Sequence, residues 1–356
     1  MALKFYNGYR CLPSTQQRTI LTIGNFDGVH RGHREIIRRV QAAAHAHQLS
    51  SLVYTFQPHP IKLLAPHRAP ALLHTYEQKR EIMASMDVDI LVAEPFDRDF
   101  ASLTPEQFVH DVLVDRMRAQ SIFVGYDFTF GRGGKAGVDA LQELAAPLGV
   151  DVEVVTPLSF EGIVASSSKV REFVAAGDVK KARLLLGRPF YLHGQVVQGF
   201  QRGRDLGFPT ANLSSVQELL PAHGVYACWV ETPEGMFPAV TNVGVRPTFQ
   251  DDVAPSVESH LLDFAGDLYD TTLRVHFVAH IRNEQSFSSV QALRQQIELD
   301  IGKARTLLAE PAGAPPEASG GTLYSSSSRL SWEEGRAPVQ DDAEGSSPSH
   351  LPLATS

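Results

Sequence analysis

The sequence TIGNFDGVHRGHREII, residues Thr22 to Ile37, decides the fold of the first half of this chain. An apolar run leads into it and an amphipathic segment follows, so a strand should end and a helix should begin within it. Its glycines allow a tight turn, and the first N–H groups of the helix then point into the crevice beyond the strand. The stretch therefore predicts an anion-binding turn at the carboxyl end of a strand.

His30 and His33 are three residues apart at the start of this helix, so both side chains should face the same bound group. An imidazole can donate a hydrogen bond to a phosphate oxygen and steady the charge of a phosphoryl-type transfer. Two other interpretations stay open from the pattern alone. The histidines could only cap and pack the turn, or they could be two ligands of a metal, with Asp27 as the nearby oxygen ligand.

The first half of the chain alternates between strand-like and helical segments. Such alternation is typical of a parallel sheet with crossover helices, and it predicts an α/β domain with ligands at the carboxyl ends of the strands. Strands are expected at 19–26, 50–56, 89–96, 120–128 and 150–158, and helices at 33–48, 75–86, 104–117 and 138–149.

The second half has a different pattern. A helical pair at 167–178 and 179–187, which Gly187 ends, leads into short strands without long helices between them, which indicates an antiparallel barrel or sandwich. These strands are expected at 190–200, 224–232, 235–245, 256–264 and 271–281, and a last helix, with Ser288 or Ser289 as N-cap, at 290–308. From residue 309 on, Pro, Gly, Ser and acids dominate, which predicts a disordered low-complexity tail. We therefore expect domains at 1–186 and 187–308, followed by the tail 309–356.

Composition limits the class of protein. A chain of 356 residues is long enough for two domains at roughly 150 residues each. Two cysteines, Cys11 and Cys228, give no disulfide framework, and neither a signal peptide nor an apolar membrane span is visible, so a cytoplasmic location is expected. The net charge of -8 argues against nucleic acid as a partner.

A second glycine-rich stretch, QGFQRGRDLGFPTANL, covers residues 198–213. Its glycines and arginines suit a loop around a polyphosphate, and the hydroxyl and amide that follow suit Mg²⁺ shared with ATP. From the four residues PTAN alone, a loop that enters a strand is the preferred interpretation. The residues concerned are Gly199, Arg202, Gly203, Arg204 and Gly207 for the loop, and Thr210 and Asn212 for the metal.

Longer strings carry a resemblance. GNFDGVHRGH resembles the signature of nucleotidyltransferases of the H-x-G-H class, and TFQPHP (55–60), FVGYDFTFGRGG (123–134) and SSSKVREFVAAGDVKKARLLLGRPF (166–190) resemble the bifunctional riboflavin kinase/FAD synthetases of bacteria. GRDLGFPTANL (203–213), with GVYACWV, AVTNVGVRPTF and ESHLLDFAGDLYD after it, is similar to the riboflavin kinase module of that family. The resemblance runs from about Arg18 to Leu308. It implies a Rossmann-like nucleotidyltransferase domain followed by a small β-barrel.

The resemblance also implies roles for residues of the first domain. His30 and His33 would be catalytic and contact the ATP phosphates, and Asp127 would lie near FMN, although an aspartate beside two glycines is also an ordinary turn residue. Val164 stands where the family typically has an arginine, so one phosphate contact is missing unless Lys169 or Arg171 replaces it. The further ATP-binding residues would be Gly24, Phe26, Asp27, Gly28, Ser167, Ser168 and Arg171, with Ser168 in place of a threonine.

In the kinase module the resemblance implies ATP binding by the loop glycines and arginines, Mg²⁺ on Thr210 and Asn212, and Glu258 as catalytic base. Strand alternation places Glu258 on one face with His260 and Leu262, so a merely solvated acid is the alternative. A carboxylate that accepts the proton of the ribityl hydroxyl is what the phosphoryl transfer needs.

The function expected from the resemblance is the synthesis of flavin cofactors. ATP would phosphorylate riboflavin to FMN, and a second ATP would adenylylate FMN to FAD with release of pyrophosphate. One alternative is an active kinase with a weakened or inactive adenylyltransferase, and another is a non-catalytic sensor of flavin nucleotides. Flavins and ATP are the expected partners of a monomer or loose homo-oligomer, without nucleic acid or membrane.

Overall fold

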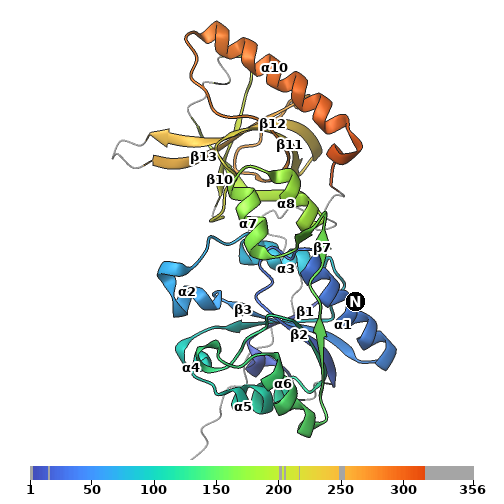
Figure 1. Ribbon diagram of the computed structural model, residues 1–356. Coiled ribbons are helices and arrows are strands. Elements are labelled where there is room, and N and C mark those ends of the chain that lie inside the picture. Colours follow the sequence, from blue (N-terminus) through green and yellow to red (C-terminus); the bar gives the residue numbers. More distant parts are fainter. Residues whose placement is uncertain are drawn as a thin grey trace, which may run out of the picture.

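A computed structural model describes residues 3–14, 17–199, 203, 206–215, 217–247 and 253–316. Figure 1 shows a sheet domain in blue and teal, a barrel in yellow and orange, and the helices α7 and α8 between them. Within the described ranges no helix is long and apolar enough to cross a lipid bilayer.

The first domain is built on a six-stranded sheet in the order β1-β4-β3-β2-β5-β6, and every pair in it is parallel. This confirms the predicted α/β domain. The short strand β1 was not predicted; it pairs with β4 at the edge of the sheet. The strands are β1 (Lys4–Asn7), β2 (Thr19–Ile23), β3 (Ser50–Gln57), β4 (Ile90–Pro95), β5 (Ala119–Gly125) and β6 (Asp151–Val155).

Helices cover both faces of this sheet. Because strand side chains alternate between faces, Leu52 packs with one set of helices and Val53 with the other. The predicted helix 104–117 has a capping box at Thr104 and continues as a π-helix over Phe108–Arg116. The helices are α1 (Arg31–His47), α2 (Pro60–Leu64), α3 (Tyr76–Ala84), α4 (Arg98–Ala101), α5 (Pro105–Gln107) and α6 (Val138–Ala145).

The second half is a closed antiparallel barrel in the order β10-β13-β12-β11-β14-β9, with β9 also paired to β10. The predicted barrel is therefore confirmed. Its interior is continuous with apolar residues of α7 and α8, such as Val174 and Leu185, so the helical pair closes one end of the barrel. The elements are a small hairpin β7 (Ser159–Phe160) and β8 (Ile163–Val164), α7 (Ser167–Ala175), α8 (Val179–Leu186), β9 (Phe190–Val197), β10 (Ala211–Ser215), β11 (Gly224–Thr232), β12 (Gly235–Pro247), β13 (Val253–Leu261) and β14 (Thr272–Arg282).

The last helix, α10 (Val290–Ala309), packs on the outside of the barrel, as Figure 1 shows in orange. Ser289 is its N-cap, and a buried ion pair of 2.8 Å between Arg282 and Asp300 ties it to β14. The chain continues in a short 3-10 turn, in which Gly313 O accepts a hydrogen bond of 2.7 Å from Trp229 Nε1. Residues 309–316, expected as the start of the tail, thus belong to the fold, and 317–356 lie outside the described residues.

Buried polar contacts join the two halves. Gln217, between β10 and β11, is buried and donates to Leu73 O at 2.9 Å, while its oxygen accepts from Gln78 Nε2 at 3.0 Å. Arg274 of β14 forms an ion pair of 2.9 Å with Glu81 of α3. The segment 72–81 of the first domain is therefore fixed to the barrel.

Candidate functional site

The turn between β2 and α1 has an unusual backbone. Phe26, Gly28 and Val29 all have positive φ angles, of 48°, 83° and 37°, and such a conformation costs energy for a β-branched residue such as Val29. Position 28 favours glycine on two grounds: its φ lies in the left-handed region, and a Cβ there would lie 2.6 Å from Leu73 Cδ1, so the Leu73 side chain would have to move. Conformations of this kind persist where the surroundings hold them, and they concentrate at functional sites.

The two histidines stack on each other at the start of α1. Their ring centroids are 3.7 Å apart, and His30 is the N-cap, with its Nδ1 accepting from His33 N at 3.4 Å. Burial, with the positive charges of Arg188 and Arg171, lowers the pKa of His30 to about 4. Burial, with the neighbouring His30, holds the pKa of His33 well below its ordinary value. Both rings are therefore neutral near pH 7. The two side chains lie side by side on the same face of α1, as their spacing predicted.

Asp27 is a buried anchor of the turn. Its carboxylate accepts hydrogen bonds from Leu73 N at 3.0 Å and from Arg171 Nη1 at 2.7 Å. Burial raises the pKa of Asp27, but the Arg171 guanidinium opposes this shift, and we assign an ionised pair. Ser167 Oγ donates to Asp27 O at 2.7 Å and joins the start of α7 to the same turn.

A cavity of about 580 Å³ opens above the turn, a size typical of ligand sites. It lies at the carboxyl ends of the strands and includes the gap between β2 and β5, where the strand order reverses, which is where open α/β sheets bind ligands. The predicted residues that line it are Gly24, Phe26, Asp27, His30, His33, Asp127, Ser167, Ser168 and Arg171, together with Val164.

The structure also distinguishes the residues considered as substitutes for the missing arginine. Lys169 pairs with Glu172 at 2.7 Å on the exposed side of α7, and it does not line the cavity. Arg171 does line it. Of the two, Arg171 is the one that reaches the cavity.

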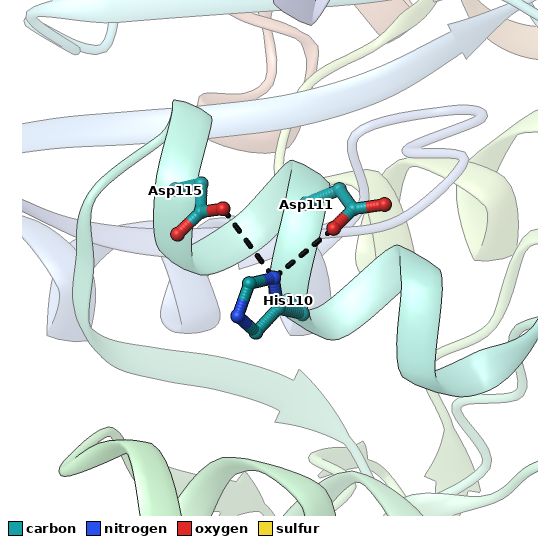
Figure 2. A group of neighbouring side chains, drawn as sticks. All are labelled: His110, Asp111 and Asp115. Carbon is teal, nitrogen blue, oxygen red and sulfur yellow. Dashed lines mark hydrogen bonds and ion pairs between the residues drawn. The ribbon is translucent and has the colours of Figure 1, made fainter.

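The structure argues against a metal held by the two histidines, because the carboxylate of Asp27, which would be its oxygen ligand, forms an ion pair with Arg171. In the part of the chain that the structure describes, one set of three His, Cys, Asp or Glu side chains has ligand atoms within 4.8 Å of one another. This set is His110, Asp111 and Asp115 on the π-helix, and Figure 2 shows His110 Nδ1 between the two carboxylates, at 3.0 and 3.3 Å. All three side chains are exposed, and the set lies outside the cavity.

The predicted kinase residues meet on the outer face of the barrel. Asn212 of β10 lies opposite Glu258 of β13, and Asn242 of β12 lies opposite Glu258 on the other side. Residues opposite each other have Cβ atoms about 5 Å apart, so the three form a row across adjacent strands. Their neighbours Leu213 and Val257 point into the barrel core, which places the row on the outside.

The glycine-rich loop approaches this row. A Cβ at Gly199 would lie 2.3 Å from Asn212 Nδ2, and one at Gly203 would lie 3.3 Å from Thr210 Oγ1. Gly207 has a φ of 84°, which is the left-handed region that favours glycine. The predicted ATP contacts Arg202 and Arg204 lie outside the described residues.

Three residues near the turn were not predicted from the sequence. Lys79 Nζ donates to Asn25 O at 2.7 Å, and Arg188 donates to Gly28 O at 2.8 Å. His74 Nδ1 lies 3.2 Å from Gly28 N, and its Nε2 lies 2.9 Å from Arg188 Nη2. Each stands in an ordinary amphipathic stretch or loop, so the sequence contains no local signal for these contacts.

An α/β domain with a glycine-rich turn at a helix N-terminus, joined to a barrel with its own glycine-rich loop, is the architecture expected of an enzyme with two nucleotide-using sites. Family models agree: residues 12–169 match the FAD synthetase family and residues 186–308 the riboflavin kinase family. The chain belongs to the family of bifunctional riboflavin kinases/FMN adenylyltransferases, and the expected synthesis of FMN and FAD is thereby confirmed at the level of the family.

Individual relatives support this membership over nearly all of the fold. The bifunctional riboflavin kinase/FMN adenylyltransferase of Escherichia coli strain K12 is 39% identical over 83% of this chain and 96% of its own length. That of Pseudomonas fluorescens is 38% identical over 87% of this chain and 99% of its own. A crystal structure described as a macrolide-efflux protein from Streptococcus pneumoniae superimposes with a TM-score of 0.77 at 30% identity, over 86% of this chain and 99% of that one.

Proposed function

We propose that the cavity of the first domain is the site of AMP transfer to FMN. A phosphate oxygen of FMN attacks the α-phosphorus of ATP, the new P–O bond forms, and the bond to pyrophosphate breaks. The observation that carries this proposal is the stack of His30 and His33 at the N-terminus of α1, inside the cavity. That arrangement puts hydrogen-bond donors and the positive end of a helix beside the charge that develops.

Neutral histidines suit this role. His30 Nδ1 accepts from His33 N, so the proton of the neutral ring is on Nε2, which can donate to a phosphate oxygen. Neither ring has to gain or lose a proton in the transfer, because the attacking FMN phosphate is already an anion. Gly24, Phe26 and Gly28 shape the turn, Ser167, Ser168 and Arg171 contribute polar groups from α7, and Asp127 faces the same cavity from the turn after β5.

The row of Asn212, Glu258 and Asn242 on the outer face of the barrel is proposed as the kinase site. Glu258 accepts the proton of the ribityl 5′-hydroxyl as the oxygen attacks the γ-phosphorus of ATP, and ADP leaves. The register that places Asn212 directly opposite Glu258 carries this assignment, because it brings the base and a metal-binding candidate to neighbouring strands.

Mg²⁺ fits the residues present. The Thr210 hydroxyl and the Asn212 amide oxygen are the hard donors that this ion takes, and the loop of Gly199 and Gly203 approaches both side chains closely enough to bring ATP phosphates to them. When bound, Mg²⁺ would neutralise charge on the transferred phosphate. The domain limits 1–186 and 187–308, the cytoplasmic location and a monomeric or loosely oligomeric state stay predictions.

A time course of riboflavin, FMN and FAD tests the two assignments together. Wild-type protein, His33→Gln and Glu258→Gln are incubated with ATP and Mg²⁺, and the flavins are separated by chromatography. His33→Gln should stop at FMN, whereas Glu258→Gln should fail with riboflavin but still convert added FMN to FAD. Wild-type protein that stops at FMN would favour the kinase with an inactive adenylyltransferase, and wild-type protein that binds flavins without any turnover would favour the sensor.

A further inference from the structure

Two cations, the buried Lys79 and the half-buried Arg188, hold the turn Asn25–His30 from outside the cavity. Lys79 Nζ donates to Asn25 O at 2.7 Å, and Arg188 donates to Gly28 O at 2.8 Å and to Val29 O at 3.1 Å. Neither side chain lines the cavity. The carbonyl groups near both ends of the strained turn are thus bound by positively charged groups, one from α3 and one from the start of the barrel half.

Neither cation has an ion-pair partner of its own among the described residues. Asp27, the acid of the turn, attracts Lys79, but its carboxylate already pairs with Arg171 at 2.7 Å. In the described ranges, no ion pair with a carboxylate is found for Arg188, whose guanidinium contacts carbonyl oxygens and the ring of His74. Its Nε atom is buried without a hydrogen-bond partner. Burial lowers the pKa of Lys79 to about 8 and that of Arg188 to about 10.

Burying a charge is costly unless an opposite charge repays it. A neutral amide or hydroxyl could donate to the same carbonyl oxygens at smaller cost, so hydrogen bonding alone does not account for two cations. The cavity on the other side of the turn is assigned to a triphosphate, whose negative charge would compensate them.

We infer that Lys79 and Arg188 are positioning residues for adenylyl transfer: they fix the turn Asn25–His30 and supply positive charge that complements the ATP phosphates. This inference rests on the assignment of the first cavity as the site of AMP transfer. It also means that the second half of the chain, which matches the riboflavin kinase model from residue 186, contributes a residue to the reaction of the first.

Matched variants of the full chain separate charge from hydrogen bonding. Arg188→Gln keeps a donor and removes the charge, Arg188→Lys keeps the charge, and Lys79→Gln repeats the test from α3. Arg116→Gln is the control, because Arg116 also donates to three backbone carbonyl oxygens, those of Tyr9, Arg10 and Leu12, but outside the cavity. For each variant, kcat and KM for ATP are measured with FMN as substrate, and riboflavin phosphorylation is measured on the same preparation.

The two Gln variants at 79 and 188 should lower kcat/KM for ATP in FAD synthesis by about 10- to 100-fold, taking as a guide the range known for groups that orient metal-binding residues. Arg188→Lys should recover most of this loss, and riboflavin phosphorylation should stay at the wild-type rate. Wild-type kcat/KM in Arg188→Gln and Lys79→Gln would overturn the inference. So would an equal loss in both activities, or a loss in Arg116→Gln as large as in Arg188→Gln. FAD formation by wild-type protein tests the underlying assignment separately.

Discussion

Breaking the ion pair between Asp27 and Arg171, which anchors the turn between β2 and α1, should destabilise the first domain strongly. Asp27 and Arg171 are 2.7 Å apart, and their side chains are only 5% and 18% exposed. Asp27→Asn leaves the guanidinium buried beside an amide that cannot neutralise it. Removing one partner of a buried pair costs about 3–5 kcal/mol. For a cooperative unit of roughly 150–250 residues, this corresponds to a fall in Tm of about 6–20 °C.

The measurement is thermal unfolding, followed by circular dichroism, of Asp27→Asn, Arg171→Met and the double variant. Because the double variant removes both charges, its loss should be smaller than the sum of the single losses. Glu172→Gln is the control on the same helix: it breaks the exposed pair with Lys169 and should change stability by less than about 0.5 kcal/mol. The pair does not hold the turn if Asp27→Asn has the same Tm as Glu172→Gln. The same conclusion follows if the stability loss of the double variant equals the sum of the two single losses.

Three further outcomes are expected. Gly28→Ala should lower the rate of FAD formation while riboflavin phosphorylation continues, because alanine is strained at a φ of 83° and its Cβ would lie 2.6 Å from Leu73 Cδ1; an unchanged FAD rate would show that the turn tolerates the change. The pKa of His30 is about 4 in the folded protein and roughly 6.5 in the unfolded chain, so the unfolded state binds a proton first as the pH falls. The contribution of His30 to the free energy of unfolding is therefore fully present above about pH 6.5, and up to about 3 kcal/mol is lost as the pH approaches 4. Melting curves of wild type and His30→Gln from about pH 8 to pH 5 check this, and the Tm of the variant should fall less over this range than the Tm of wild type. Burial raises the pKa of Cys228 to about 12, so a thiol reagent should label only Cys11 in native protein and both cysteines in denaturant; rapid native labelling of Cys228 would contradict the buried assignment.

Local patterns were sufficient to predict the turn and its histidines. A strand end, a glycine-rich turn and a helix start are adjacent in sequence, and residues three apart on a helix face the same side, so the contact between His30 and His33 followed from their spacing. The same pattern predicted Asp27 at the site but not its buried pairing with Arg171, which comes from a helix more than a hundred residues away. A pairing of this kind depends on tertiary packing.

Register and burial account for what the sequence could not predict. Strand alternation predicted the face of Glu258, but its position opposite Asn212 depends on which strands pair in the barrel. Lys79 lies in an ordinary amphipathic helix and Arg188 follows a helix end, and both look like surface cations until the fold buries them. The strand β1 has only four residues and is followed by a short 3-10 turn, Tyr9–Cys11, and not by a crossover helix, so it gave no periodic signal.

The contacts between Gln217, Leu73 and Gln78 bear on how this chain can be taken apart or recombined. The segment that they hold contains Leu73, whose N–H binds the Asp27 carboxylate. An exchange of the barrel for that of another family member would therefore replace part of the support of the turn between β2 and α1. A working chimera has to keep Arg188, Gln217 and Arg274 as partners of the first domain, so the contacts to match lie within the barrel and not only at the apparent domain boundary.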